Sequence, residues 1–135
     1  MINRLKSLLE AEDYTCVLYG RDEVISSRER GIKPLIGFID SGNDFNGFSA
    51  ADKIVGKAAA LLYAYMGVKE LYAEVIGRQA LEVCEKYGIA VTYGIVTPKI
   101  INRKGDGVCP MEEAVEGIND PASAVTAVKE KLKRL

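Results

Sequence analysis

The pattern between residues 70 and 97 limits the fold more than any other part of the chain. Two apolar, β-rich runs, at 70–76 and 89–97, flank residues 78–87, which have helical spacing and are followed by Gly88. Two strands of one sheet joined through a helix run parallel, and the crossover is right-handed in nearly all proteins. The chain is therefore expected to form an α/β fold in which helices cover a partly parallel sheet.

The other segments are interpreted from the same periodicities. A helix is predicted at 2–12, a hairpin from strands at 14–19 and 23–27, and short helices at 35–40 and 110–118. A long central helix is predicted at 49–66, with Ser49 and Asp52 as a capping box and Gly67 at its end. A last helix follows Asp120 and Pro121. Residues 1–135 are thus expected to form one three-layer α/β/α domain with a mixed four- to five-stranded sheet.

Composition excludes several kinds of chemistry. The 135 residues include no histidine, so imidazole is excluded as a base, a nucleophile or a metal ligand. The three cysteines, Cys16, Cys84 and Cys109, are widely spaced and odd in number, which argues against a disulfide framework and predicts a cytoplasmic location. A net charge of −1 and apolar runs too short to span a bilayer give no reason to expect a nucleic-acid or membrane partner.

Three segments carry a resemblance to a known family. They are Ser-Arg-Glu-Arg-Gly-Ile-Lys-Pro-Leu at 27–35, Ala-Asp-Lys-Ile-Val-Gly-Lys-Ala-Ala-Ala at 51–60, and Ile-Asn-Arg-Lys-Gly-Asp-Gly-Val-Cys-Pro-Met-Glu-Glu-Ala at 101–114. With these segments the chain resembles an uncharacterised prokaryotic family, a domain of unknown function with a cytidine-deaminase-like fold. The order of a hairpin, a central helix and a strand–helix–strand unit is also that of the cytidine deaminase fold. The resemblance implies a fold and no established activity.

The zinc motifs of a deaminase are missing from this sequence. A zinc deaminase carries His or Cys two residues before a Glu at the start of the central helix, and Pro-Cys-x-x-Cys at the start of the next. Here residues 49–52 are Ser-Ala-Ala-Asp and residues 77–80 are Gly-Arg-Gln-Ala. Three soft ligands are therefore absent, and neither a metal nor a cofactor is expected.

The segment 101–113 is the strongest candidate for a site. It brings Asn102, Arg103 and Asp106 between the last strand and a helix, where α/β sheets commonly bind ligands. Arg103 suits a carboxylate or phosphate, and Asp106 suits a ribose hydroxyl or the role of a base. The alternative is an ordinary Gly-Asp-Gly turn with solvated charges. Cys109 precedes Pro110 at a helix start, which suits a nucleophile, although a capping or buried cysteine is the alternative.

Two lysines are expected to contribute to the same cleft. Lys53 and Lys57 are four residues apart in the predicted central helix and would lie on one of its faces, with Lys53 near the positive helix end. The alternative is a solvated basic stripe. This expectation requires the stretch after the last strand to lie beside the start of the central helix.

Three hypotheses about function follow. The first is metal-independent binding of a small anionic metabolite, such as a nucleotide or an ADP-ribose-like group, by Lys53, Lys57, Asn102 and Arg103. The second is a non-catalytic protein-interaction module that forms a homo-oligomer through the sheet edge or the small-residue helix. The third is an enzyme that depends on Cys109. Whether the chain is an enzyme is left open by the sequence.

Overall fold

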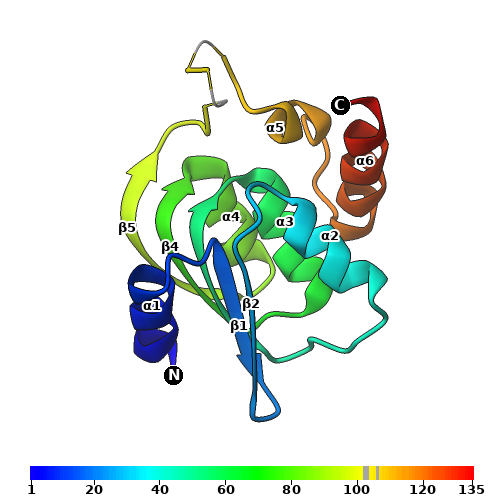
Figure 1. Ribbon diagram of the computed structural model, residues 1–135. Helices are drawn as coiled ribbons and strands as arrows, with labels where there is room; N and C mark the ends of the chain where they lie inside the picture. Colours follow the sequence, from blue (N-terminus) through cyan, green and yellow to red (C-terminus); the bar gives the residue numbers. More distant parts are fainter. Residues whose placement is uncertain (102–103, 106) are drawn as a thin grey trace.

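The computed structural model describes residues 1–101, 104–105 and 107–135, and its centre is a mixed five-stranded sheet (Figure 1). The strands are Cys16–Gly20 (β1), Glu23–Ser27 (β2), Ser49–Val55 (β3), Glu70–Gly77 (β4) and Ala90–Thr97 (β5), and they lie in the order β2-β1-β3-β4-β5. β1 is antiparallel to β2 and β3, whereas β3, β4 and β5 are parallel. The predicted hairpin and the predicted parallel pairing of the strands at 70–76 and 89–97 are confirmed.

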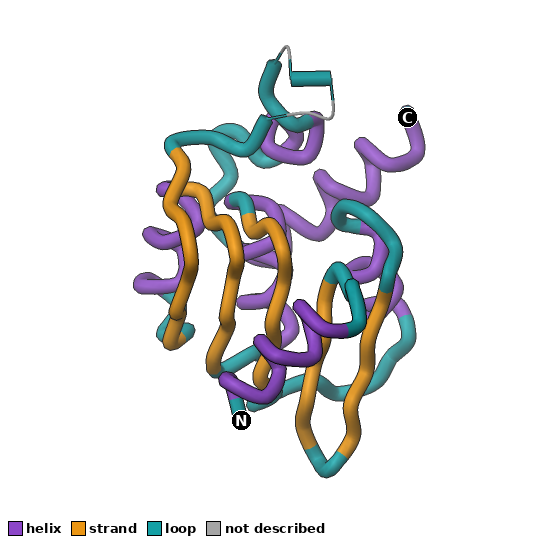
Figure 2. Tube along the Cα trace, turned by 60° about the vertical axis from the view of Figure 1, so that its left-hand side comes forward, coloured by secondary structure: helices purple, strands orange, loops and turns teal. Residues whose placement is uncertain are grey.

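The helices divide unequally between the two faces of the sheet (Figure 2). They are Ile2–Ala11 (α1), Lys33–Asp40 (α2), Lys57–Met66 (α3), Arg78–Lys86 (α4), Pro110–Ala114 (α5) and Pro121–Arg134 (α6). One face is covered by α1, whose Leu5 and Leu9 pack on Val17, Ala51 and Tyr72. The opposite face carries the larger core, to which α3 contributes most of its side chains. None of the helices in the described ranges is long and apolar enough to cross a membrane.

The prediction of a central helix over residues 49–66 is wrong in its first half. Residues 49–55 form β3, and α3 begins only at Lys57. β3 lies in the middle of the sheet, and its first three residues are buried on both faces, since Ala50 belongs to the core under α3 and Ala51 to the core under α1. Such a strand lacks the alternation of apolar and polar residues, so it cannot be told from a buried helix by periodicity.

The predicted capping box is also wrong. The hydroxyl of Ser49 donates a hydrogen bond to the carboxylate of Glu70 on the neighbouring strand. Asp52 accepts its hydrogen bonds from Tyr63 and from the backbone N–H of Ile54. Both side chains therefore stabilise contacts of β3 instead of a helix start.

Candidate functional site

Two helices begin side by side at the carboxyl ends of the parallel strands. β3 leads through Gly56 into α3, and β4 ends at Gly77, from which α4 begins. A Cβ built on Gly77 would lie 3.8 Å from Cα of Gly56, so the two helix starts are in contact. Neither glycine has a side chain to cap its helix, and the first N–H groups of a helix attract an anion.

The N-terminus of α3 holds the carboxylate of Glu112. The backbone N–H of Lys57 donates to Oε1 at 2.8 Å, and the N–H of Ala58 donates to Oε2 at 3.0 Å. A Cβ at position 56 would collide with this carboxylate, so glycine is needed there for the approach. Glu112 lies on α5, 55 residues along the chain from Lys57, so α5 supplies the cap that α3 lacks locally.

Lys57 adds a buried positive charge below this contact. Its side chain is 9% exposed, and its ammonium group donates a hydrogen bond to the carbonyl oxygen of Val115 at 3.1 Å. Within the described ranges, no Asp or Glu carboxylate forms an ion pair with it. The N-terminus of α3 therefore holds the Glu112 carboxylate, while the buried ammonium group of Lys57 and the adjacent start of α4 add further positive charge to this end of the sheet.

The prediction of a central helix placed Lys53 and Lys57 on one face of that helix. In the structure the two side chains do not share a face. Lys53 lies on β3, and its ammonium group forms an ion pair with Asp13, immediately after α1. That ammonium group holds the pKa of the Asp13 carboxyl below its ordinary value. The two lysines are thus engaged with elements on opposite faces of the sheet, because residues 53 and 57 belong to a strand and a helix instead of one helix.

Cys109 is the residue before α5 and is half-buried against the main core. Its carbonyl oxygen accepts hydrogen bonds from the N–H groups of Glu112 and Glu113, while its own N–H donates to Ile100. The backbone of Cys109 therefore starts α5 and so positions Glu112. The other predicted site residues, Asn102, Arg103 and Asp106, lie outside the described residues.

The sequence did not indicate a polar pair formed by the half-buried Asp52 and the buried Tyr63. The Tyr63 hydroxyl donates to Oδ2 of Asp52 at 2.6 Å, beside the buried thiol of Cys16. Burial raises the pKa of Asp52 to about 7, although the hydrogen bond from Tyr63 opposes the rise. The same burial raises the pKa of the Tyr63 hydroxyl well above its ordinary value. A carboxyl that titrates near neutrality is a candidate for proton transfer.

The Glu112 carboxylate occupies the N-terminus of α3, at the carboxyl end of β3. One surface hollow lies between α1 and the hairpin, and another between α5 and α6, and neither reaches Gly56 or Lys57. In the part of the chain that the structure describes, no three side chains of Cys, Asp or Glu gather as a metal ion would require. Access to the α3 N-terminus therefore depends on α5, which carries Glu112.

These features define a mixed α/β protein whose candidate site is a helix N-terminus occupied by an internal carboxylate. The chain belongs to the DUF1893 (TM1506) family, a domain of unknown function, whose model matches residues 4–132. It is similar to a crystal structure of a DUF1893 family protein (TM1506) from Thermotoga maritima. The two chains are 26% identical with a TM-score of 0.85, over 98% of this chain and 88% of that one. No curated protein matches this chain. The expected membership of an uncharacterised family is confirmed.

Proposed function

We propose that this chain binds a small anionic metabolite, without a metal ion, at the N-terminus of α3. The observation that carries the proposal is the pair of hydrogen bonds from Lys57 N–H and Ala58 N–H to a carboxylate. A ligand phosphate or carboxylate would make the same two bonds in place of Glu112. The buried ammonium group of Lys57 and the adjacent start of α4 would stabilise the added negative charge.

Glu112 would act as an internal competitor for the ligand. Hydrogen bonds to a charged group contribute about 1.5–3 kcal/mol each, and a ligand must replace both before it gains affinity. Glu112 would leave the N-terminus of α3 when the ligand binds. Asn102, Arg103 and Asp106 precede α5 in the sequence and are expected to contact the rest of the ligand, such as the ribose and second phosphate of a nucleotide or ADP-ribose-like group.

We also propose that the fold is cytidine-deaminase-like, with a site that has lost its metal. A zinc deaminase places its ligands at the starts of the two helices that follow the central parallel strands. In this chain those helices begin Gly56-Lys57-Ala58 and Gly77-Arg78-Gln79, so neither start offers a soft ligand. The helix start at residue 57, like the start predicted at residue 49, therefore lacks the zinc motif of a deaminase.

Isothermal titration calorimetry on Glu112→Gln tests the ligand proposal. This change keeps the side-chain shape but removes the competing charge, so we expect AMP, ADP-ribose or inorganic phosphate to bind at least about tenfold more tightly than to the wild-type protein. Glu113→Gln is the matched control, because Glu113 is the exposed neighbour of Glu112 and undergoes the same change. We expect this variant to bind like the wild type, and Lys57→Met to weaken binding in the Glu112→Gln background.

Two results would count against the proposal. One is the absence of binding of all three compounds to both the wild-type protein and Glu112→Gln. The other is binding that Glu113→Gln strengthens as much as Glu112→Gln does, because the effect would then come from net charge and not from the N-terminus of α3.

A further inference from the structure

Strand β5 is an edge of the sheet that nothing covers in the described part of the chain. It pairs with β4 on one side only, and five of its eight residues are exposed (Figure 1). Tyr93 is 47% exposed and Ile95 is 64% exposed. An edge of this kind presents unpaired backbone N–H and C=O groups to any other strand that approaches.

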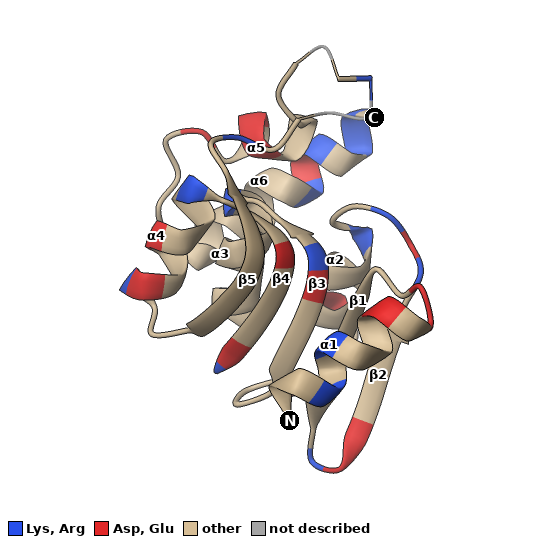
Figure 3. Cartoon of the chain, turned by 90° about the vertical axis from the view of Figure 1, so that its left-hand side faces the viewer, with Lys and Arg blue, Asp and Glu red and all other residues tan. Residues whose placement is uncertain are grey.

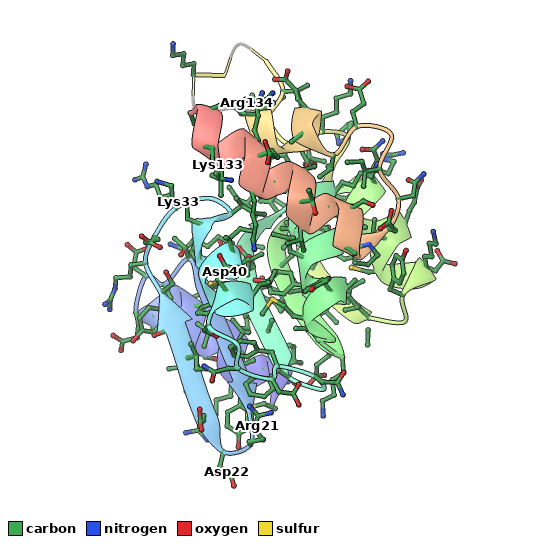
Figure 4. All side chains as sticks on the ribbon, turned by 90° about the vertical axis from the view of Figure 1, so that its right-hand side faces the viewer. Arg21, Asp22, Lys33, Asp40, Lys133 and Arg134 are labelled. Atoms are coloured by element: carbon green, nitrogen blue, oxygen red, sulfur yellow. The ribbon has the colours of Figure 1, made fainter. Side chains whose placement is uncertain are left out.

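The two edges of the sheet differ in charge. The opposite edge, β2, has five residues and charged neighbours at both ends, including Arg21 and Asp22 at the hairpin tip (Figure 4) and Arg28. β5 has the sequence Ala-Val-Thr-Tyr-Gly-Ile-Val-Thr, without a charge or a proline. Charged side chains and proline are the usual means by which edge strands avoid pairing with other chains. β2 carries Glu23 and has charged neighbours at both ends, whereas β5 has a proline and a charge only beyond its carboxyl end, at Pro98 and Lys99, so β5 is the less protected edge.

An apolar row runs from the middle of the sheet to this edge. Ile54, Val75 and Ile95 are paired in register across β3, β4 and β5. Ile54 lies on the central strand and is nevertheless 55% exposed, so none of the described helices covers this part of the sheet (Figure 3). An apolar row that continues to an uncharged edge is typical of a surface that contacts another protein.

We propose that β5 pairs antiparallel with β5 of a second copy of the chain, across a two-fold axis normal to the sheet. The second copy fits this edge because the strand is neutral along its whole length, so self-pairing brings no like charges together. Such an axis keeps the faces of the two sheets aligned, so each side chain lies opposite one that points to the same face. Odd-numbered residues of β5 therefore pair with odd-numbered residues, and the partners available to Tyr93 within β5 of the second copy are Val91, Tyr93, Ile95 and Thr97. Both copies use the same strand in this contact, so the assembly is complete as a dimer.

The resulting sheet is continuous through both copies, and the apolar rows of the two copies lie on the same face of it. A single pair of strands covers less area than a standard stable interface of about 800 Å² per partner. We therefore expect a reversible dimer with a dissociation constant on the order of micromolar. The α3 N-terminus takes no part in the pairing, so this proposal does not depend on ligand binding.

Sedimentation velocity over a roughly hundredfold range of concentration tests the proposal. We expect the wild-type protein to change from one copy to two, and Ile95→Lys to remain monomeric throughout. Val24→Lys is the matched control, since Val24 is an exposed apolar residue of the other edge strand, at 53% exposure, and should dimerise like the wild type. Far-ultraviolet circular dichroism establishes that each variant is folded.

Hydrogen exchange distinguishes this dimer from any other. The amide protons of β5 should exchange more slowly as concentration rises, whereas those of β2 should not change. A wild-type protein that stays monomeric over the whole range would overturn the proposal. A dimer whose β5 amides are not protected, or one that Val24→Lys weakens as much as Ile95→Lys, would overturn it as well.

Discussion

The carboxyl of Asp52 makes the stability of the fold depend on pH. Asp52 belongs to β3, and its carboxyl accepts hydrogen bonds from Tyr63 of α3 and from the N–H of Ile54. Burial raises its pKa to about 7, from an ordinary value of 3.8. Asp52→Asn keeps the size of the side chain and removes the titration.

The direction and size of the effect follow from this shift. Between about pH 4 and pH 7 the folded state keeps a proton that the unfolded state has released, so the free energy of unfolding falls as pH rises. The stabilisation from this group is fully present below pH 4 and is lost as pH rises through 7. A shift of about 3 units corresponds to a limit of about 4 kcal/mol, of which about 2.5 kcal/mol falls between pH 5 and pH 8.

Urea unfolding at pH 5 and pH 8 measures this effect. From pH 5 to pH 8, the free energy of unfolding of the wild-type protein should fall by about 2.5 kcal/mol more than that of Asp52→Asn. Asp22→Asn makes the same change at the exposed hairpin turn and serves as the control. If the free energies of unfolding of the wild-type protein and Asp52→Asn change in parallel from pH 5 to pH 8, the raised pKa of Asp52 is refuted.

Other predictions concern the contact of α5 with α3. Gly56→Ala should lower the free energy of unfolding by about 1–3 kcal/mol, because its Cβ collides with the Glu112 carboxylate, and the cost should shrink in a Glu112→Ala background. Equal costs in both backgrounds, measured by urea unfolding, would contradict this account. In the native protein, iodoacetamide should label Cys109 before Cys16 and Cys84, which are 3% and 0% exposed. The hypothesis of a Cys109-dependent enzyme requires labelling faster than that of a free thiol, and mass spectrometry of labelled peptides measures both.

Much of the fold could be predicted from local signals. Gly67 ends α3 with a left-handed backbone at φ 79°, as its position in the sequence predicted. The parallel unit from β4 to β5 could be predicted because its two strands are short apolar runs and Gly88 marks the end of the helix between them. The start of α3 could not be predicted in the same way. Ala50 and Ala51 are small and face two different cores, so the strand that contains them has the apolar pattern of a buried helix.

The candidate site could be predicted only in part. Lys57 was selected for its spacing from Lys53 in a helix that the structure does not contain, and its place at the start of α3 and its hydrogen bond to Val115 depend on tertiary packing. The role of Glu112 depends on a contact across 55 residues, for which periodicity and spacing give no signal. Asp52 was misassigned for a related reason, since its pairing with Tyr63 becomes visible only when residues 49–55 are placed in the sheet.

Amide chemical shifts of Glu112→Gln during a titration with AMP test most directly whether the N-terminus of α3 binds a ligand oxyanion. The account predicts that the backbone N–H resonances of Lys57 and Ala58 move together and saturate, since these two groups would donate to the phosphate. Saturable shifts that leave both resonances in place and cluster elsewhere, or no shifts at all, would contradict it.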